Sequence, residues 1–110
     1  MYCLTILPYL LPSLSAQDMI VKNMSFKVGQ TLTVVGVPKP DASNFSLNIG
    51  SDEQEITFHM NPRFNAHGDE NAVVCNSYQG GNWCEEHREG GFPFQQGEEF
   101  KVKPRVCVCV

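Results

Sequence analysis

The 110-residue chain has few basic residues, no long apolar run and no low-complexity tract. Its 8 lysines and arginines against 12 acidic residues leave a net charge of −4, which argues against a nucleic-acid partner because phosphate binding needs a basic patch. Charges of both signs are mixed along the chain, so electrostatic attachment to a membrane has no basis. The length allows one small domain.

The first twenty residues are the least informative part. An apolar stretch from Tyr2 to Leu14 is followed by small residues, as before a signal-peptide cleavage site, but no basic residue precedes it and two prolines interrupt it. It is too short and too broken for membrane insertion. We therefore expect residues 1–20 to be a signal-like N-terminal extension. Two Asn-x-Ser sequons, at Asn23 and Asn44, are meaningful only if the chain enters the secretory pathway.

From Val21 onward the pattern is one of short strands and polar turns, without a helical period. Alternating or β-branched apolar runs predict strands at Met24–Val28, Thr31–Val37, Phe45–Gly50, Glu55–Asn61 and Ala72–Asn76. A further strand begins at the Glu-Glu-Phe-Lys-Val segment near the C-terminus. This spacing predicts an all-β chain folded as an antiparallel sandwich or barrel.

The most informative residues lie on the strand that contains His59, Asn61 and Arg63. Alternate residues of a strand face the same way, so these three side chains project together, with neighbours about 7 Å apart. Such a row spans one sugar ring, while Met60 points toward a core. A solvated polar face is the plain alternative for this row taken alone.

A second group of residues makes a binding cleft the better interpretation. Val74 and Asn76 share one strand face, and Glu86 and Arg88 share another. Trp83 is the only tryptophan and follows a Gly-Gly-Asn turn that does not easily bury an indole, although a lone tryptophan is more often part of a core. The C–H-rich face of a sugar packs on such a ring. The whole set is typical of a sugar-binding cleft.

These residues carry a family resemblance. The runs HMNPRF, VCN and WCEEHR resemble the galectin signature H-x-N-P-R-F, V-x-N and W-x-x-E-x-R, and the similarity extends over residues 21–102. The resemblance implies an antiparallel jelly-roll β-sandwich with a single carbohydrate-recognition domain. Residues 103–110 are an atypical tail without resemblance to the further strands of the family. We therefore expect the sandwich to be incomplete at the C-terminus, with part of its apolar face uncovered.

The resemblance implies a lectin for β-galactosides of the lactose and N-acetyllactosamine type, not an enzyme, with no metal and no cofactor. It implies that seven side chains bind the carbohydrate: His59, Asn61, Arg63, Asn76, Trp83, Glu86 and Arg88. The first three would bond the axial galactose O4, and Trp83 would stack on the ring. Asn76 and Glu86 would hold O6, and the two arginines would reach the second sugar with Glu86. His67, Asp69 and Val74 are implied as supporting residues.

Two departures from the family pattern have consequences. Cys84 stands where the family usually has glycine, which would cost about 1 kcal/mol if the backbone there required a positive φ. The absent strands include those through which the familiar dimer forms, so the resemblance leaves a homodimer possible but makes it doubtful. The expected partners are galactoside glycans of glycoproteins or glycolipids, met in the cytoplasm and, by leaderless secretion, outside the cell.

Two other functions stay open. The five cysteines (Cys3, Cys75, Cys84, Cys107 and Cys109) form an odd set, which favours free thiols over a disulfide framework. Cys75, Cys84 and His87, with His59 or His67, are of the types that bind zinc, although Cys75 should point away from Asn76. A sandwich that has lost sugar binding and acts through protein contacts is the second alternative. No nucleophile–base pair or opposed carboxylate pair suggests an enzyme.

Overall fold

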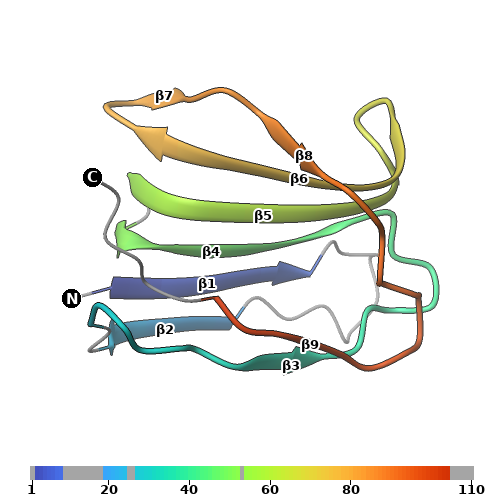
Figure 1. Ribbon diagram of the computed structural model, residues 1–110, viewed down its shortest axis with the longest axis horizontal. Coiled ribbons are helices and arrows are strands. Elements are labelled where there is room, and N and C mark those ends of the chain that lie inside the picture. The colour runs from blue at the N-terminus through green and yellow to red at the C-terminus, as the bar shows by residue number, and fades with distance from the viewer. Residues whose placement is uncertain (1, 9–18, 25–26, 53, 105–110) are drawn as a thin grey trace.

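The computed structural model describes residues 2–8, 19–24, 27–52 and 54–104. This part of the chain forms β-strands joined by turns and loops, which confirms the predicted all-β class (Figure 1). The strands are β1 (Tyr2–Pro8), β2 (Met19–Met24), β3 (Val34–Gly36), β4 (Phe45–Asp52), β5 (Glu55–Ala66), β6 (Asp69–Gln79), β7 (Asn82–Trp83), β8 (His87–Glu89) and β9 (Phe100–Val102).

The strands form one large antiparallel sheet and one small one. In the large sheet the order is β2-β1-β4-β5-β6, and the outer edge of β6 pairs with β7 near one end and with β8 further along. The small sheet pairs β3 with β9 and lies against the large sheet (Figure 1). The chain between β7 and β8 therefore runs along the outer edge of β6, where the Cys84 backbone N–H donates to the Ser77 carbonyl at 2.9 Å.

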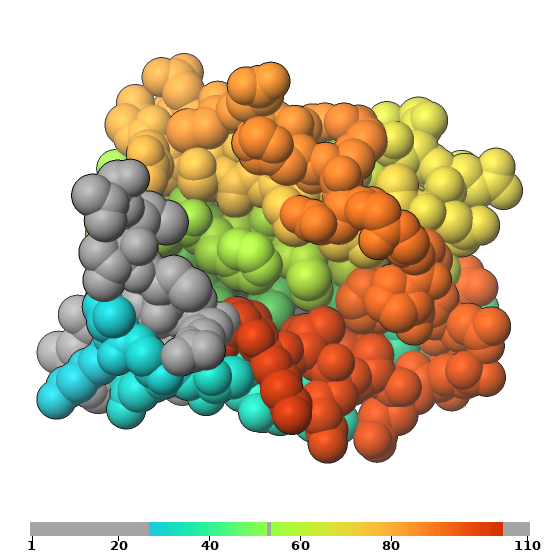
Figure 2. Space-filling model, in the orientation of Figure 1, coloured from blue at the N-terminus to red at the C-terminus, as the bar shows by residue number. Residues whose placement is uncertain are grey.

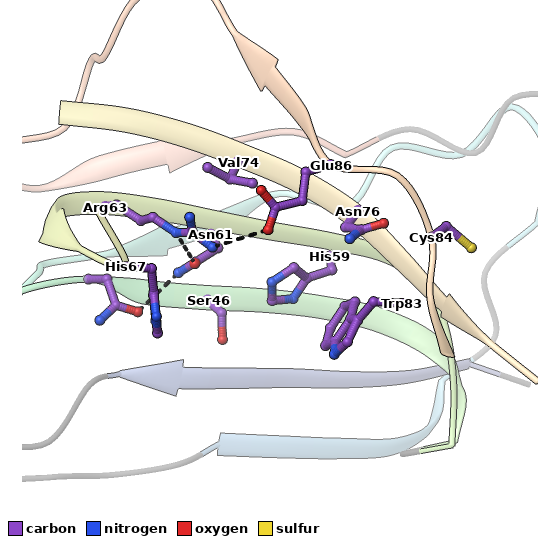
Figure 3. Close-up of a pocket in the computed structure, with 11 residues that line it drawn as sticks. Ser46, His59, Asn61, Arg63, His67, Val74, Asn76, Trp83, Cys84 and Glu86 are labelled. Carbon is purple, nitrogen blue, oxygen red and sulfur yellow. Dashed lines mark hydrogen bonds and ion pairs between the residues drawn. The ribbon is translucent and has the colours of Figure 1, made fainter. Parts of the chain in front are cut away.

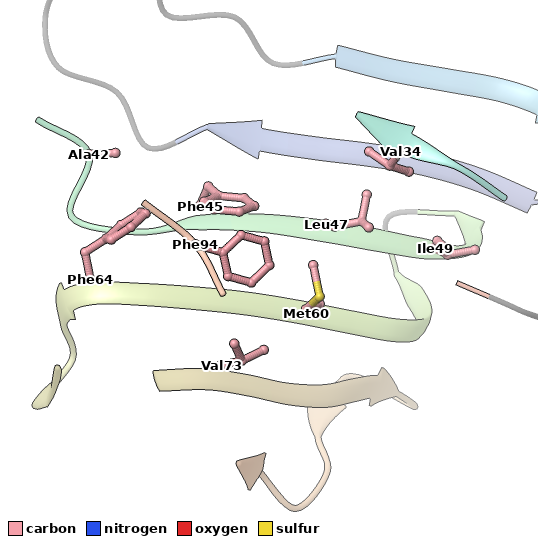
Figure 4. Close-up of a cluster of buried hydrophobic side chains, with 9 residues drawn as sticks. All are labelled: Val34, Ala42, Phe45, Leu47, Ile49, Met60, Phe64, Val73 and Phe94. Carbon is pink, nitrogen blue, oxygen red and sulfur yellow. The ribbon is translucent and has the colours of Figure 1, made fainter. Parts of the chain in front are cut away.

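The core lies between these two layers. Figure 4 shows apolar side chains of β4, β5 and β6 pointing to the same side, toward Val34 of β3 and Phe94. Phe45 is the centre of an aromatic cluster: its ring centroid lies 5.3 Å from that of Phe94 and 5.0 Å from that of Phe100. In Figure 2, part of the green β5 strand remains visible beside the red β9 segment, so the small sheet covers the large one only in part.

Strand alternation divides the central strands into two faces with different chemistry. Leu47 of β4, Met60 of β5 and Cys75 of β6 are neighbours in register and lie on the core side. Their neighbours in sequence form the opposite row, in which His59 stands between Asn48 and Asn76. The period of two thus puts an apolar row and a polar row back to back on the same strands.

Several strand boundaries differ from the sequence prediction. The prediction of a strand at Met24–Val28 is wrong, because β2 ends at Met24 and Lys27–Gln30 form a turn. In this turn the Gln30 side chain accepts a hydrogen bond of 2.7 Å from the Lys27 backbone N–H. The strand expected at Thr31–Val37 shrinks to β3, since its partner β9 pairs with only three of its residues. Both β5 and β6 run longer than predicted.

The N-terminal segment contributes a strand that the sequence patterns did not indicate. Residues 1–20 were expected to precede the domain, but β1 lies between β2 and β4 and pairs antiparallel with both. The small residues ahead of Gln17 and the tail residues 105–110 lie outside the described residues. In the described part of the chain, no helix has the length and apolarity needed to cross a membrane.

Candidate functional site

The polar face of the large sheet carries a cleft of about 420 Å³. Six of the seven predicted sugar-binding residues line it, as do the predicted supporting residues His67 and Val74 (Figure 3). The full lining is Asn44, Ser46, His59, Asn61, Arg63, His67, Val74, Asn76, Trp83, Cys84 and Glu86. The cleft is therefore built from β4, β5 and β6, with the segment between β7 and β8 forming its upper wall.

Hydrogen bonds within the protein fix the orientation of the β5 row, which consists of His59, Asn61 and Arg63. Asn61 donates from Nδ2 to the Asn44 Oδ1 atom at 3.0 Å and to the Phe45 carbonyl at 2.7 Å. Its Oδ1 atom accepts a hydrogen bond of 2.8 Å from Arg63 Nε. Asn61 is only 5% exposed, so these contacts are shielded from water and fix its orientation.

Asp69 joins the two arginines. It accepts a hydrogen bond of 2.7 Å from Arg63 and bonds of 3.0 and 2.9 Å from Arg88. The bonds from Arg88 first, and then the bond from Arg63, lower the pKa of Asp69 to about 2. The bonds to Asp69 in turn raise the pKa of Arg88. Glu86 lies 3.1 Å from Arg88 and 3.8 Å from Arg63, which closes the network. Arg88 does not line the cleft itself; it braces Asp69 and Glu86 from outside.

This network orients hydrogen-bonding groups at one end of the cleft. The Arg63 side chain is 10% exposed, whereas those of Glu86 and Arg88 are nearly half exposed. Exposed ion pairs contribute little to stability, about 0–1 kcal/mol. A guanidinium fork held by fixed carboxylates is instead a preformed set of donors and acceptors for ligand hydroxyl groups.

Trp83 is an exposed aromatic platform, as its place after the glycine turn suggested. Its side chain is 51% exposed although it is the largest apolar residue of the site. Two rings hold it: the centroid of Tyr78, its cross-strand partner, lies 5.1 Å away and that of His59 lies 4.7 Å away. Gly80 and Gly81 both have positive φ, so they form the tight turn that brings β7 back along β6.

His59 has a defined proton arrangement. Its Nδ1 atom is hydrogen-bonded to Asn48 Oδ1, and because a carboxamide oxygen only accepts, Nδ1 carries the proton. Burial and, to a lesser extent, the nearby Arg63 lower the pKa of His59, against the opposing influence of Glu86. The ring is therefore neutral near pH 7, and its Nε2 atom is an acceptor available to the cleft.

Sequence reasoning missed the β4 side of the cleft. Asn44 and Ser46 line it and Asn48 orients His59, but none of them belonged to the predicted set. The alternation of polar residues with Phe45 and Leu47 was visible in the sequence. What was not visible was that β4 pairs beside β5, with Asn48 opposite His59, and so extends the same polar row.

Cys75 and Cys84 lie on opposite sides of the sheet. Cys75 packs against the core, as predicted, and burial raises its pKa. Cys84 is exposed at the cleft; its φ is not positive, so the backbone strain considered for this position does not arise. Within residues 27–52 and 54–104, no cluster of three or more His, Cys, Asp or Glu residues is placed to hold a metal ion.

The sequence matches the family model of galactoside-binding lectins over residues 18–107. It is 56% identical over 89 residues to a β-galactoside-binding lectin of Electrophorus electricus, covering 81% of this chain and 69% of that protein.

Solved structures give the same picture. The fold is similar to a crystal structure of galectin-1-L2 from "Dario rerio", with a TM-score of 0.74 and 62% identity over 76% of this chain and 64% of that one. It is also similar to toad ovary galectin in complex with N-acetylgalactose, with a TM-score of 0.75 and 41% identity over 77% of this chain and 63% of that one. The chain thus spans about two thirds of the length of these proteins.

Proposed function

Because the chain belongs to the galactoside-binding lectin family, we propose that it binds β-galactosides of the lactose and N-acetyllactosamine type. Binding would need no metal, and no reaction would follow. The observation that carries the proposal is the cleft, where one half-exposed tryptophan faces a hydrogen-bonded row of His59, Asn61 and Arg63. The proteins that share the match are named as lectins, not as enzymes.

The proposed contacts are those that the resemblance to the galectins implies, and the free polar groups of the cleft are of the types that these contacts need. The neutral His59 Nε2 atom accepts a bond from a sugar hydroxyl, while Arg63 donates to the oxygen of the same hydroxyl. The axial O4 would be this hydroxyl, with the apolar face of the ring resting on Trp83. Asn76 and Glu86 also line the cleft and would take O6. Arg88, through its bonds to Asp69 and Glu86, fixes the end of the cleft where the second sugar lies.

The proposed partners are galactose-terminated glycans of glycoproteins or glycolipids. The proposal includes synthesis in the cytoplasm and action both there and outside the cell, reached without a classical leader. Fractionation of cells that express the untagged full chain, with lactose added to release surface-bound protein, tests this location. Protein found only within the secretory organelles would contradict it.

Trp83 provides a direct assay because it is the only tryptophan. Its fluorescence is followed while the full chain is titrated with lactose or with maltose, each with and without EDTA. A saturable change with lactose alone, unaffected by EDTA, is the expected result. A response to both sugars would contradict galactose recognition, and loss of the response with EDTA would favour a metal site instead.

A matched pair of variants locates the site. Asn61→Ala removes a residue of the β5 row, and Asn65→Ala changes an exposed asparagine of the same strand outside the cleft. We expect lactose affinity to fall by roughly tenfold or more in the first and to stay within about twofold in the second. A wild-type sample that unfolds cooperatively but does not respond to lactose would favour the alternative of a sandwich that acts through protein contacts.

A further inference from the structure

The strand β1 lies inside the sheet that carries the cleft, although its sequence lies outside the family match. The match begins at residue 18, whereas β1 spans Tyr2–Pro8. In the sheet, β1 pairs antiparallel with β2 on one side and with β4 on the other (Figure 1). Among the described strands, β2 has no partner other than β1. Without β1, the described sheet would therefore end at β4, and β2 would lose its place in it.

The pairing of β1 reaches the part of β4 that serves the cleft. The register places Thr5 opposite Asn48 and Leu7 opposite Ser46. Ser46 lines the cleft, and Asn48 accepts the hydrogen bond that fixes the ring of His59. Ser46 is only 8% exposed and Asn48 only 6%, although both belong to the polar face. Such burial is typical of an interior strand, and β4 is interior because β1 pairs with it on the side away from β5.

An edge strand would hold these side chains less firmly. The outer N–H and C=O groups of an edge strand have no partners within the sheet, so the strand opens and frays more readily. With β4 at the edge, Asn48 would move relative to His59, and water would compete for their hydrogen bond. His59 would then lose the contact that keeps its proton on Nδ1, and Nε2 would no longer be a fixed acceptor.

We propose that β1 is a positioning element of the galactoside site, which acts through β4 and Asn48 on His59. The inference rests on the proposed function. It also gives a role to the apolar segment near the N-terminus, because the residues of that segment that form β1 become part of the working lectin. A copy that lost β1 would keep all seven predicted sugar-binding residues, yet its His59 would be poorly oriented and its affinity for galactosides lower.

The test weakens two strands of the full chain in the same way, one beside β4 and one in the small sheet. Thr5→Gly acts on β1, where Thr5 pairs with Ile20 of β2 and with Asn48 of β4. Val35→Gly is the matched control, because Val35 is half exposed and pairs with Lys101 of β9. Glycine inside a strand weakens both through its backbone freedom. Thr5→Val keeps a β-branched residue and should behave as wild type.

Two readouts are taken at a temperature at which circular dichroism shows each variant to be folded. Lactose affinity is followed by Trp83 fluorescence. The protonated ring nitrogen of His59 is identified by NMR of the imidazole nitrogens, whose His59 signals are assigned by their absence in His59→Gln. A substitution that only lowers stability leaves both readouts of the folded molecules unchanged. Should Thr5→Gly not fold, Thr5→Ala is compared with Val35→Ala in the same way.

We expect Thr5→Gly to weaken lactose binding by roughly three- to tenfold, as loss of one oriented hydrogen bond would, and to give a mixture of His59 tautomers. Val35→Gly should stay within about twofold of wild type and keep the proton on Nδ1. Wild-type affinity in Thr5→Gly would overturn the inference, as would an equal loss in Val35→Gly or a loss without any change at His59. If the folded wild-type chain does not bind lactose, the proposed function has failed, but the tautomer of His59 in Thr5→Gly still decides whether β1 acts on it.

Discussion

Replacing Asn61 by alanine should destabilise the fold as well as weaken lactose binding. The substitution removes three hydrogen bonds: two donated to Asn44 and the Phe45 carbonyl, and one accepted from Arg63. At about 1 kcal/mol for each bond the loss is about 3 kcal/mol. The Phe45 carbonyl and the Arg63 Nε group would be left unpaired near the core, which raises the expected loss to about 3–5 kcal/mol.

A loss of that size is large for a small domain, whose total stability is about 5–15 kcal/mol. Urea unfolding followed by far-ultraviolet circular dichroism measures it, with Asn65→Ala as the control, expected to lie within about 0.5 kcal/mol of wild type. Asn61→Asp sharpens the reasoning, because it keeps an acceptor for Arg63 but turns both donors into acceptors. It should be no more stable than the alanine variant.

The reasoning is refuted if Asn61→Ala unfolds within about 0.5 kcal/mol of wild type, since the hydrogen bonds would then add nothing beyond those made with water. It is also refuted if Asn61→Asp recovers wild-type stability, because the donated bonds to Asn44 and Phe45 would then be unimportant.

Four further predictions concern Trp83, Gly50, His59 and Asp69. Trp83→Ala should weaken lactose binding, measured by calorimetry, by roughly tenfold or more. The free energy of unfolding should change by less than about 1 kcal/mol, because the ring is half exposed. A large loss of stability would contradict the role of Trp83 as a platform for the sugar. Gly50→Ala should lower the free energy of unfolding by about 1–3 kcal/mol or more, since the added Cβ would lie 2.0 Å from the Glu55 carbonyl oxygen. Gly90→Ala, with open space around it, serves as the control in the same urea assay. Lactose affinity should stay constant through pH 6.5, the ordinary pKa of histidine, and fall only at lower pH, because burial lowers the pKa of His59 and only its protonation removes the acceptor; affinity measured by Trp83 fluorescence as a function of pH checks this. Asp69 should stabilise the folded chain fully above its ordinary pKa of 3.8, and this stabilisation should disappear as the pH falls through about 2. It should be missing in Asp69→Asn. Acid unfolding curves that are the same for both proteins would contradict this prediction.

Periodicity was sufficient to place the side chains of a strand once the strand itself was recognised. The alternation of His59, Asn61 and Arg63 with Met60 assigned them to opposite faces, and the same rule correctly put Cys75 on the core side and Asn76 in the cleft. These assignments are local, because they depend only on the two-residue repeat of a strand. Strand boundaries were less certain, since pairing with a distant partner ends β3 early and lengthens β5.

What strand pairing decides could not be read from the sequence. The β4 residues Asn44, Ser46 and Asn48 join the site only because β4 pairs beside β5, and β1 joins the sheet only because it pairs with β4. Asp69 was predicted as a supporting residue, but its position between Arg63 and Arg88 depends on the pairing of β8 with β6.

The amino-acid sequence by itself thus determined the fold class, the row of polar residues on β5 and the identity of the aromatic platform, because each follows from residue type and local repeat. The tertiary structure decided which of these groups meet. It showed that Arg88 braces the cleft from outside, that Cys84 carries no backbone strain, and that the sequon at Asn44 lies inside the proposed binding site. Those facts depend on contacts between residues far apart in the chain, which no local pattern encodes.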